Sequence, residues 1–259
     1  MLFRSLAVHG RFSEAPCIVI AASSPADCFE VAYEACRLAV RHMTPVIVLS
    51  DGFIANGAEP WRLPDLDALE PIDVRYRTDP AGFQPYLRDP ITLARPWAIP
   101  GTPGLEHRIG GLEKREDSGE VSYDPDNHER MVQLRAEKVA RVADDLPLAE
   151  VVGDDTGGLL VVGWGSTWGS ITSAVRRARQ RGLRVGQVHL RHLNPMPRNL
   201  GDVLARFDRV LVPEINLGQL ALLLQGRYLK PVIRLNHVRG LPFAAAEILE
   251  KIVEIEEAR

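Results

Sequence analysis

Two apolar runs near the N-terminus have the length and composition of buried strands. Residues 17–22 (Cys-Ile-Val-Ile-Ala-Ala) and residues 45–49 (Pro-Val-Ile-Val-Leu) are almost continuously apolar. Runs of this kind are typical of parallel strands that are covered on both faces. Because a crossover helix normally joins two parallel strands, the pattern predicts a βαβ unit.

The segment between these runs has the pattern of an amphipathic helix. Ser24 is a favourable N-cap, Pro25 suits the first turn, and Asp27 places negative charge at the positive end of the helix dipole. One face carries small apolar residues at helical spacing: Cys28, Val31, Ala32, Ala35, Cys36 and Ala39. The opposite face carries Asp27, Glu30, Glu34, Arg37 and Arg41. We expect the apolar face to pack on the sheet, with Cys28 and Cys36 as small buried thiols.

A βαβ unit of this size is too small to cover a parallel sheet. Two strands and one helix leave one sheet face without a partner. The N-terminal unit must therefore belong to something larger. Either another subunit completes the sheet, or the sequence is a piece of a longer polypeptide.

Prolines dominate the next part of the chain. Nine of the nineteen prolines fall within residues 60–103, which excludes long helices and central strands there. We predict a long, extended connection that follows a partner surface, with a disordered linker as the open alternative. A helix capped by Asn127 follows, with Met131, Val132, Val139 and Val142 on one stripe.

The last hundred residues alternate regularly between strand and helix patterns. The expected strands are residues 159–163, 184–190, 209–212 and 231–235, and the expected helices are residues 170–180, 200–205, 217–225 and 243–257. This alternation predicts a doubly wound α/β domain with a mainly parallel sheet. The predicted organisation is an α/β unit in residues 1–65, a connection with a bridging helix in residues 66–154, and the doubly wound domain in residues 155–259.

Composition narrows the class of protein. The chain is 46% hydrophobic and 25% charged, as in ordinary globular proteins, and its formal charge of −3 argues against a nucleic-acid surface. No apolar run reaches the roughly 20 residues of a membrane helix, and the start lacks a secretory signal, so we expect a cytoplasmic protein. Cys17, Cys28 and Cys36 form no C-x-x-C pair, so we expect no metal in this chain.

The glycine-rich turn of residues 163–169 follows a strand and precedes a helix. Backbone N–H groups at such a turn can receive an anion, although the G-x-G-x-x-x-G spacing departs from the dinucleotide fingerprint. Three interpretations remain open: a tight turn in which Ser166 and Thr167 cap the helix, an anion or partner contact through the same two residues, and an NADP site in which Arg191 meets the phosphate.

A second candidate site follows the second apolar run. Ligands in open α/β sheets bind at the carboxyl ends of strands, which makes Asp51, Asn56 and Glu59 candidates. The competing interpretation is structural, since Asp-Gly and Asn-Gly are strong turn formers. Glu106, His107 and His192 lack partners at a recognisable spacing, so we assign them no chemistry.

Motifs spread over nearly the whole chain resemble the α subunits of the thiamine-diphosphate-dependent 2-oxoacid:ferredoxin oxidoreductase family, and within it the enzymes for 2-oxoglutarate. The resemblance rests on Gly10-Arg11 with Glu14-Ala15-Pro16, residues 25–29, 43–61, 104–107, 123–131 and 163–167, and Glu214-Ile215-Asn216-Leu217-Gly218-Gln219. It implies that the N-terminal unit is the second half of the pyrimidine-binding domain. It also implies that the last domain is like the transketolase C-terminal domain.

The resemblance further implies an activity that requires partners. Such enzymes convert a 2-oxoacid, CoA and oxidised ferredoxin to acyl-CoA, carbon dioxide and reduced ferredoxin. Thiamine diphosphate lies between subunits, and the β subunit supplies the diphosphate and magnesium site and an iron–sulfur cluster. On this basis the expected partners are a β subunit, ferredoxin through the complex and a separate N-terminal half of the α subunit, with neither nucleic acid nor a membrane.

One departure from the family matters for mechanism. The family's cofactor-binding glutamate and its substrate-binding threonine and arginine belong to a part that would precede Met1. We therefore expect no catalytic residue here, no cofactor bound by this chain alone, and no turnover by the isolated chain. A noncatalytic assembly or regulatory remnant and an NADP-binding oxidoreductase remain as alternatives.

Overall fold

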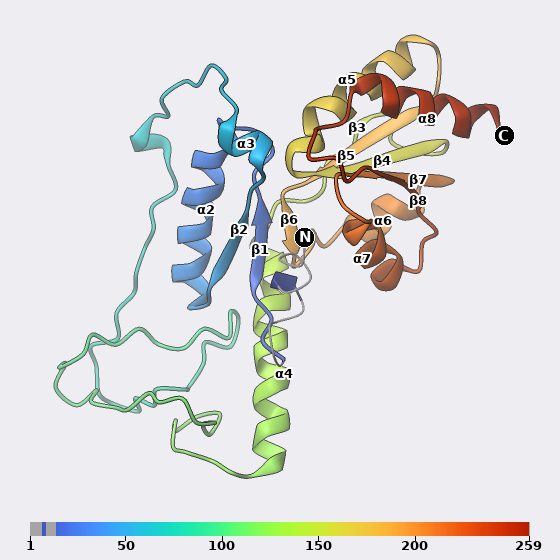
Figure 1. The fold of residues 1–259 in the computed structure, drawn as a ribbon. Helices are drawn as coiled ribbons and strands as arrows, with labels where there is room; N and C mark the ends of the chain where they lie inside the picture. Colours follow the sequence, from blue (N-terminus) through green and yellow to red (C-terminus); the bar gives the residue numbers. More distant parts are fainter. Residues whose placement is uncertain (1–6, 9–13, 259) are drawn as a thin grey trace.

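A computed structural model describes residues 7–8 and 14–258, which form two β-sheets joined by a long connection (Figure 1). The first sheet has the strand order β2-β1-β6, and the second has the order β3-β5-β4-β7-β8. The Gly10-Arg11 motif lies outside the described residues.

The predicted N-terminal βαβ unit is present. Strand β1 (Ile18–Ala21) pairs in parallel with β2 (Val46–Leu49), and helix α2 (Asp27–His42) crosses between them. The helix begins at Asp27 with Ala26 as its N-cap, so the prediction that Ser24 is the N-cap is wrong. The Ser24 hydroxyl instead accepts a bond from the Asp27 N–H at 3.3 Å across the preceding turn.

The buried face of α2 is narrower than its sequence suggests. Val31, Ala35 and Leu38 pack against β1, and they share this core with side chains of α3 and α4. Cys28 is half-buried and Cys36 is exposed, so the prediction that both thiols are buried is wrong. The physical reason is that no described residue covers the side of α2 on which Cys36 lies.

A third strand joins the N-terminal sheet from the other end of the chain. Strand β6 (His192–Asn194) pairs antiparallel with β1. The Ala21 N–H donates to the Arg191 carbonyl at 2.8 Å, and the Asn194 amide donates to the Cys17 carbonyl at 2.8 Å. The chain therefore extends one edge of its own N-terminal sheet, a source of strands that the sequence analysis did not consider.

The connection is extended, as predicted. It contains the 3₁₀ turn η1 (Leu66–Ala68) and only isolated bridges among its described residues, and it loops away from the sheets in Figure 1. Trp97 fixes it to α2 by donating to the Val40 carbonyl at 3.0 Å. Many of its apolar side chains are nevertheless exposed: Trp61, Leu63, Leu66, Tyr76, Leu87, Ile91, Ile99, Ile109, Leu112, Val121 and Tyr123.

The bridging helix is longer than predicted. Helix α4 runs from Pro125 to Arg141 and continues into the 3₁₀ turn η2 (Val142–Asp145). Asp124 caps it through the Asp126 N–H, whereas Asn127 donates to the Lys114 carbonyl at 2.9 Å. The prediction of an Asn127 cap is therefore wrong, because the Asp-Pro pair starts the helix three residues earlier.

The second sheet has the predicted doubly wound architecture. Its strands are β3 (Val152–Gly153), β4 (Leu159–Trp164), β5 (Val185–Leu190), β7 (Arg209–Glu214) and β8 (Ile233–Asn236). All pairs are parallel except the short edge strand β3. In Figure 1, α5 (Trp168–Gln180) and α8 (Ala245–Glu257) cover one face, and α6 (Leu200–Ala205) and α7 (Gln219–Tyr228) cover the other.

The two sheets share one core. Val19 and Ala21 of β1 pack in the same cluster as Leu160 and Val162 of β4 and as side chains of α6 and α7. The neighbouring residues Ile18 and Ile20 face α2. Strand β1 is therefore covered on both faces. Within the described residues, no helix has the length and apolar character needed to cross a membrane.

Candidate functional site

The carboxyl ends of β2 and β4 lie side by side, which brings the two predicted candidate sites together. After β2, Asp51 caps the short helix α3 (Gly52–Asn56) by accepting from the N–H groups of Phe53 and Ile54, both at 3.0 Å. An acidic N-cap satisfies backbone donors that a helix start leaves free. The loop expected here as a turn is therefore a capped helical turn.

The glycine-rich turn after β4 forms the opposite side. Gly165 has a φ of +60°, a conformation that favours glycine, and it opens the 3₁₀ turn η3 (Gly165–Thr167). The Thr167 hydroxyl donates to the Trp164 carbonyl at 2.7 Å, and the Ser166 hydroxyl donates to the Asp51 carboxylate. The tight turn is therefore present as predicted, but neither side chain caps α5, so the capping part of that interpretation is wrong.

A cavity of about 270 Å³ lies beside this contact. It is lined by Ala22, Leu49, Ser50, Asp51, Ile54, Trp164, Gly165, Ser166, Thr167, Ile215, Asn216 and Gln219. Its walls come from both sheets, so its shape depends on how the two sheets are held together. The Asp51–Ser166 contact is a polar bridge across that junction.

A buried carboxylate behind the cavity was not singled out from the sequence. Glu214, at the end of β7, is fully buried and accepts from the N–H groups of Leu220 and Ala221 at the start of α7. It also accepts from the Trp164 indole and the Asn216 amide, each at 3.1 Å. An acidic residue that ends an apolar strand before a helix is the signal that identifies it. Glu214 fixes the cavity wall formed by Trp164 and Asn216.

The other two predicted candidates lie outside the cavity. The Glu59 carboxylate accepts from the Ser24 hydroxyl at 2.5 Å and from the Ala26 N–H, so it supports the start of α2. The Asn56 side chain is exposed and donates to the Gly52 carbonyl at 2.8 Å within its own helix. The structure thus brings together Asp51, Ser166 and Thr167, but not Asn56 or Glu59.

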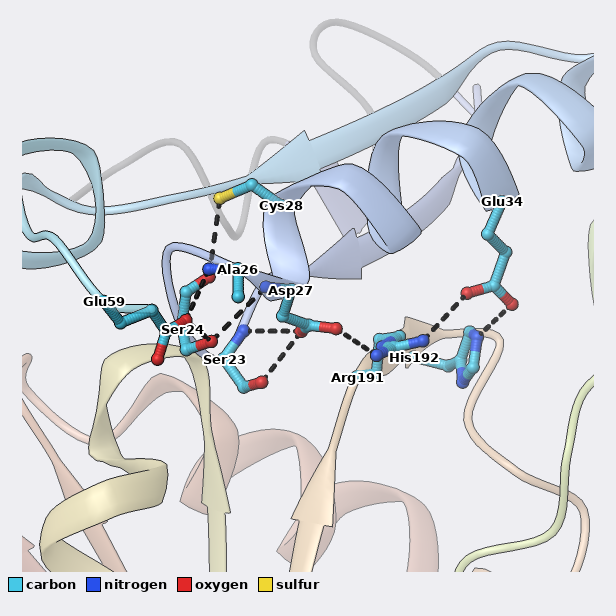
Figure 2. A network of polar contacts seen from close by, with 9 residues as sticks. All are labelled: Ser23, Ser24, Ala26, Asp27, Cys28, Glu34, Glu59, Arg191 and His192. Atoms are coloured by element: carbon cyan, nitrogen blue, oxygen red, sulfur yellow. Dashed lines mark hydrogen bonds and ion pairs between the residues drawn. The ribbon is translucent and has the colours of Figure 1, made fainter. Parts of the chain in front are cut away.

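A network of ion pairs joins α2 to the segment between β5 and β6 (Figure 2). Arg191 contacts the Asp27 carboxylate and lies 3.6 Å from Glu34, and His192 lies 2.7 Å from Glu34. Burial acts to raise the pKa of Glu34, but the hydrogen bond from His192 and the charges of His192 and Arg191 outweigh it and lower that pKa. Arg191 is thus paired with α2 carboxylates, which leaves the NADP interpretation without its phosphate contact.

His189, at the end of β5, is a buried histidine. Neither ring nitrogen has a hydrogen-bond partner among the described residues. Burial lowers its pKa to about 4, so its ring is neutral near pH 7. Glu106 accepts from the Gly104 N–H, and His107 contacts the Leu105 carbonyl and, edge to face, the Phe83 ring. Among the described residues, no three His, Cys, Asp or Glu side chains are grouped to hold a metal ion.

Two family models match the chain. Residues 2–124 match the thiamine diphosphate-binding domain of pyruvate flavodoxin/ferredoxin oxidoreductases. Residues 158–237 match core domain II of pyruvate:ferredoxin oxidoreductases. The first matched segment contains β1 and β2 of the first sheet, and the second contains β4, β5, β7 and β8 of the second sheet. Strand β3 precedes the second match. Strand β6 lies within the second match but pairs in the first sheet.

Curated relatives and a solved structure agree with these models. The chain is 55% identical to the 2-oxoglutarate oxidoreductase subunit KorA of Mycobacterium tuberculosis, over 93% of this chain and 37% of that protein. It is 32% identical to subunit alpha of the 2-oxoacid:ferredoxin oxidoreductase 1 of Aeropyrum pernix, over 85% of this chain and 35% of that protein.

The solved structure is the 2-oxoglutarate:ferredoxin oxidoreductase of Magnetococcus marinus with 2-oxoglutarate, coenzyme A and succinyl-CoA bound. It superposes with a TM-score of 0.88 and 31% identity, over 96% of this chain and 44% of that one. The chain spans well under half the length of each of these three proteins. The arrangement of two sheets, the family models and these relatives together show that the chain belongs to the 2-oxoacid:ferredoxin oxidoreductase family and matches part of its α subunit.

Proposed function

We propose that this chain forms part of the α subunit of a thiamine-diphosphate-dependent 2-oxoacid:ferredoxin oxidoreductase. The reaction takes a 2-oxoacid and CoA to acyl-CoA and carbon dioxide, and the electron pair released reduces ferredoxin. The observation that carries this proposal is the 55% identity to a 2-oxoglutarate oxidoreductase subunit over 93% of the chain. The same relative supports 2-oxoglutarate as the substrate.

The proposal includes a division of labour between subunits. Residues 2–124 match a thiamine diphosphate-binding domain, and the family resemblance implies that this cofactor lies between subunits. We therefore route no chemical step through the described residues alone. We assign the magnesium, the diphosphate site and the iron–sulfur cluster to a β subunit.

In this proposal the chain organises an interface. Strand β2 is an edge strand, and Val48 on it is 43% exposed, although parallel strands are normally buried. An open edge offers unpaired N–H and C=O groups to a neighbouring strand. We assign this edge, together with the exposed apolar residues of the connection, to the remainder of the α subunit.

Reconstitution tests this proposal. The chain is purified alone and after coexpression with a β subunit and the missing part of the α subunit. Viologen reduction is then measured with thiamine diphosphate, magnesium, CoA and 2-oxoglutarate. We expect a brown complex that is active, and an isolated chain that is inactive. Activity of the chain alone would contradict the division of labour, and failure to bind either partner would contradict the proposal itself.

Variants of edge strands sharpen the same experiment. A lysine on an edge strand blocks pairing with a neighbour. Val48→Lys on β2 is expected to reduce complex formation by about tenfold or more, which corresponds to about 1.4 kcal/mol. Val152→Lys on β3, the edge of the second sheet with an exposed valine, is the matched control and is expected to leave the complex intact.

Complex formation without activity would favour the noncatalytic assembly role over the enzyme subunit. The exposed apolar connection suits both roles, because both require a partner surface. Measuring binding and viologen reduction on the same preparation therefore separates them.

A further inference from the structure

A hollow of about 1000 Å³ lies between α2 and the long connection, away from the cavity at Asp51. The two spaces have no lining residue in common. Apolar side chains such as Leu87, Ile91 and Trp97 form much of its wall. Five arginines also line it: Arg37, Arg41, Arg75, Arg88 and Arg95.

Three of these arginines are neutralised by carboxylates. The pairs are Arg37 with Glu70 at 3.4 Å, Arg41 with Asp145 at 2.8 Å and Arg75 with Asp73 at 2.9 Å. Arg88 and Arg95 differ, because neither forms an ion pair with any residue in the described ranges 7–8 and 14–258. Asp89 also lines the hollow, and the charge of Glu116 acts on Arg88, so these two guanidinium groups have carboxylates nearby but form a direct ion pair with none of the described residues.

Both unpaired guanidinium groups lie against one aromatic ring. Arg95 is 4.7 Å and Arg88 is 5.6 Å from the centroid of the Tyr86 ring. Arg88 also donates to the Glu116 carbonyl at 2.6 Å and to the Tyr86 carbonyl at 3.2 Å, which fixes its position. The Arg95 guanidinium makes no hydrogen bond to any described residue, so its five donors are available.

A third cation approaches from α4. Lys138 donates to the Met43 carbonyl at 3.0 Å. Its burial, followed by the charges of Arg95 and Arg88, lowers its pKa to about 8. Like charges held together in a partly buried place repel one another unless an anion offsets them.

We propose that Arg88 and Arg95 form a binding site for a phosphate-bearing small molecule in this hollow, with the charge of Lys138 nearby although Lys138 does not line it. The planar fork of an arginine matches the oxygens of a phosphate, and a diphosphate carries enough charge to neutralise this cluster. The hollow has the volume of a pocket for a nucleotide-sized ligand, and Leu87, Ile91 and Trp97 are placed to contact its uncharged part. The inference uses none of the residues at the Asp51 cavity, but it shares Leu87 and Ile91 with the surface that the proposed function assigns to a partner, so binding is measured both in the chain alone and in the assembled complex.

Calorimetric titration of the full chain with inorganic pyrophosphate tests the proposal, with sodium chloride at equal ionic strength as the reference. We expect saturable binding of one pyrophosphate per chain. Arg95→Gln is expected to weaken that binding by about tenfold or more. The matched control is Arg75→Gln, which alters an exposed, paired arginine of the same hollow and is expected to change affinity by less than about twofold.

A second readout does not depend on the fold of a variant. In the wild-type chain, pyrophosphate is expected to raise the pKa of Lys138, measured by NMR of its labelled side chain, because an anion favours the charged amine. Adenosine diphosphate serves as a second probe. If adenosine diphosphate binds more tightly than pyrophosphate, the site recognises a nucleotide. If the two bind equally, the site recognises the phosphate groups alone. Both results support the site.

Three results would overturn the proposal. The first is a response to pyrophosphate no larger than that to sodium chloride. The second is unchanged affinity in a folded Arg95→Gln variant. The third is loss of pyrophosphate binding when the chain is assembled with its partner subunits, which would mean that polypeptide carboxylates occupy the hollow.

Discussion

The two sheets of this chain contain similar apolar strands, but they differ in how those strands are covered. In the second sheet, β4 is buried along nearly its whole length between two layers of helices. In the first sheet, β1 is equally buried, but its neighbour β2 is only half-buried and forms an open edge. The edges of the second sheet are open as well, since β8 is only half-buried and β3 is exposed, so the contrast is sharpest between central strands and edge strands.

Apolar residues therefore have two roles in this chain: some stabilise its fold, and others are exposed for contact with another polypeptide. In β4 and β7 they stabilise the fold of the chain, since burial removes them from water. In β2 and along the connection, they remain available to another polypeptide. Predictions about individual side chains therefore depend on whether their strand is central or at an edge.

The largest expected effect on the free energy of unfolding comes from comparing the same valine-to-alanine change in a strand of each sheet. Val162→Ala in β4 removes a fully buried side chain and is expected to lower the free energy of unfolding by about 2–3 kcal/mol. Val48→Ala in β2 is expected to cost less than about 0.5 kcal/mol in the isolated chain. Urea denaturation of both variants measures the contrast, and equal losses would remove the distinction between the buried central strand β4 and the open edge strand β2.

The buried histidine of the second sheet gives the next effect. The pKa of His189 is about 4 in the folded chain and has its ordinary, higher value when unfolded, so the unfolded state binds the proton more readily below about pH 6.5. Stability is expected to fall by about 2 kcal/mol between pH 7 and pH 5 through this residue.

A variant isolates that contribution from other groups. His189→Leu replaces the imidazole with an apolar side chain of similar size. Because neither ring nitrogen of His189 has a hydrogen-bond partner among the described residues, the free energy of unfolding at pH 7 is expected to change little. Its pH dependence between 7 and 5 is expected to be flatter than that of the wild type. Parallel pH profiles would show that His189 titrates normally in the folded chain.

The ion pairs between the two regions give a smaller effect. Arg191→Gln leaves Asp27 and Glu34, which are 11% and 14% exposed, without their guanidinium partner. Because Arg191 itself is 37% exposed, we expect a loss of only about 1–2 kcal/mol. Arg198→Gln, which alters an exposed arginine 3.9 Å from Asp144, is the control and is expected to change stability by less than about 0.5 kcal/mol. Thermal unfolding at low and high salt compares the two variants, and similar shifts in Tm would contradict a role for Arg191 in joining the sheets.

The smallest effect concerns the bridge at the cavity. Asp51→Ala removes the cap of α3 and the contact with Ser166, with an expected loss of about 1 kcal/mol. Asn56→Ala removes one exposed bond within the same helix and is expected to cost less than about 0.5 kcal/mol. The difference in unfolding midpoints measures the bridge, and identical midpoints would show that Asp51 does not stabilise it.

The second sheet was predictable because each of its parallel strands is long enough to show a pattern. Strand β5 was expected at residues 184–190 and lies at Val185–Leu190, and α5 ends at Gln180 as expected. Apolar periodicity and local caps predict elements of this kind. Strand β3 was missed because it has only two residues, both exposed.

The first sheet was predictable only in its local part. The sequence pattern predicts the βαβ unit but not β6. Strand β6 has only three residues, too few to show an alternating pattern, and they form a strand by pairing with β1. The burial of α2 was overestimated for a related reason. Of the apolar face predicted from the sequence, Val31 and Ala35 are buried together with Leu38, whereas Ala32 and Cys36 are exposed.

The candidate site was partly predictable. Its position at the carboxyl ends of strands singled out Asp51, and the glycine spacing singled out Ser166 and Thr167. Their mutual contact depends on how the two sheets pack, which sequence patterns do not encode. Asn56 and Glu59 were grouped with Asp51 by proximity along the chain, and α3 turns both away from the cavity.

Amide hydrogen exchange tests most directly whether the first sheet is incomplete. In the isolated chain, we expect the amides of β4 to exchange slowly and the amides of β2 that point away from β1 to exchange near the rate of unprotected backbone. Assembly with the β subunit and the remainder of the α subunit is expected to protect those β2 amides. Equal protection of β2 and β4 in the isolated chain, or no change in β2 on assembly, would contradict the account.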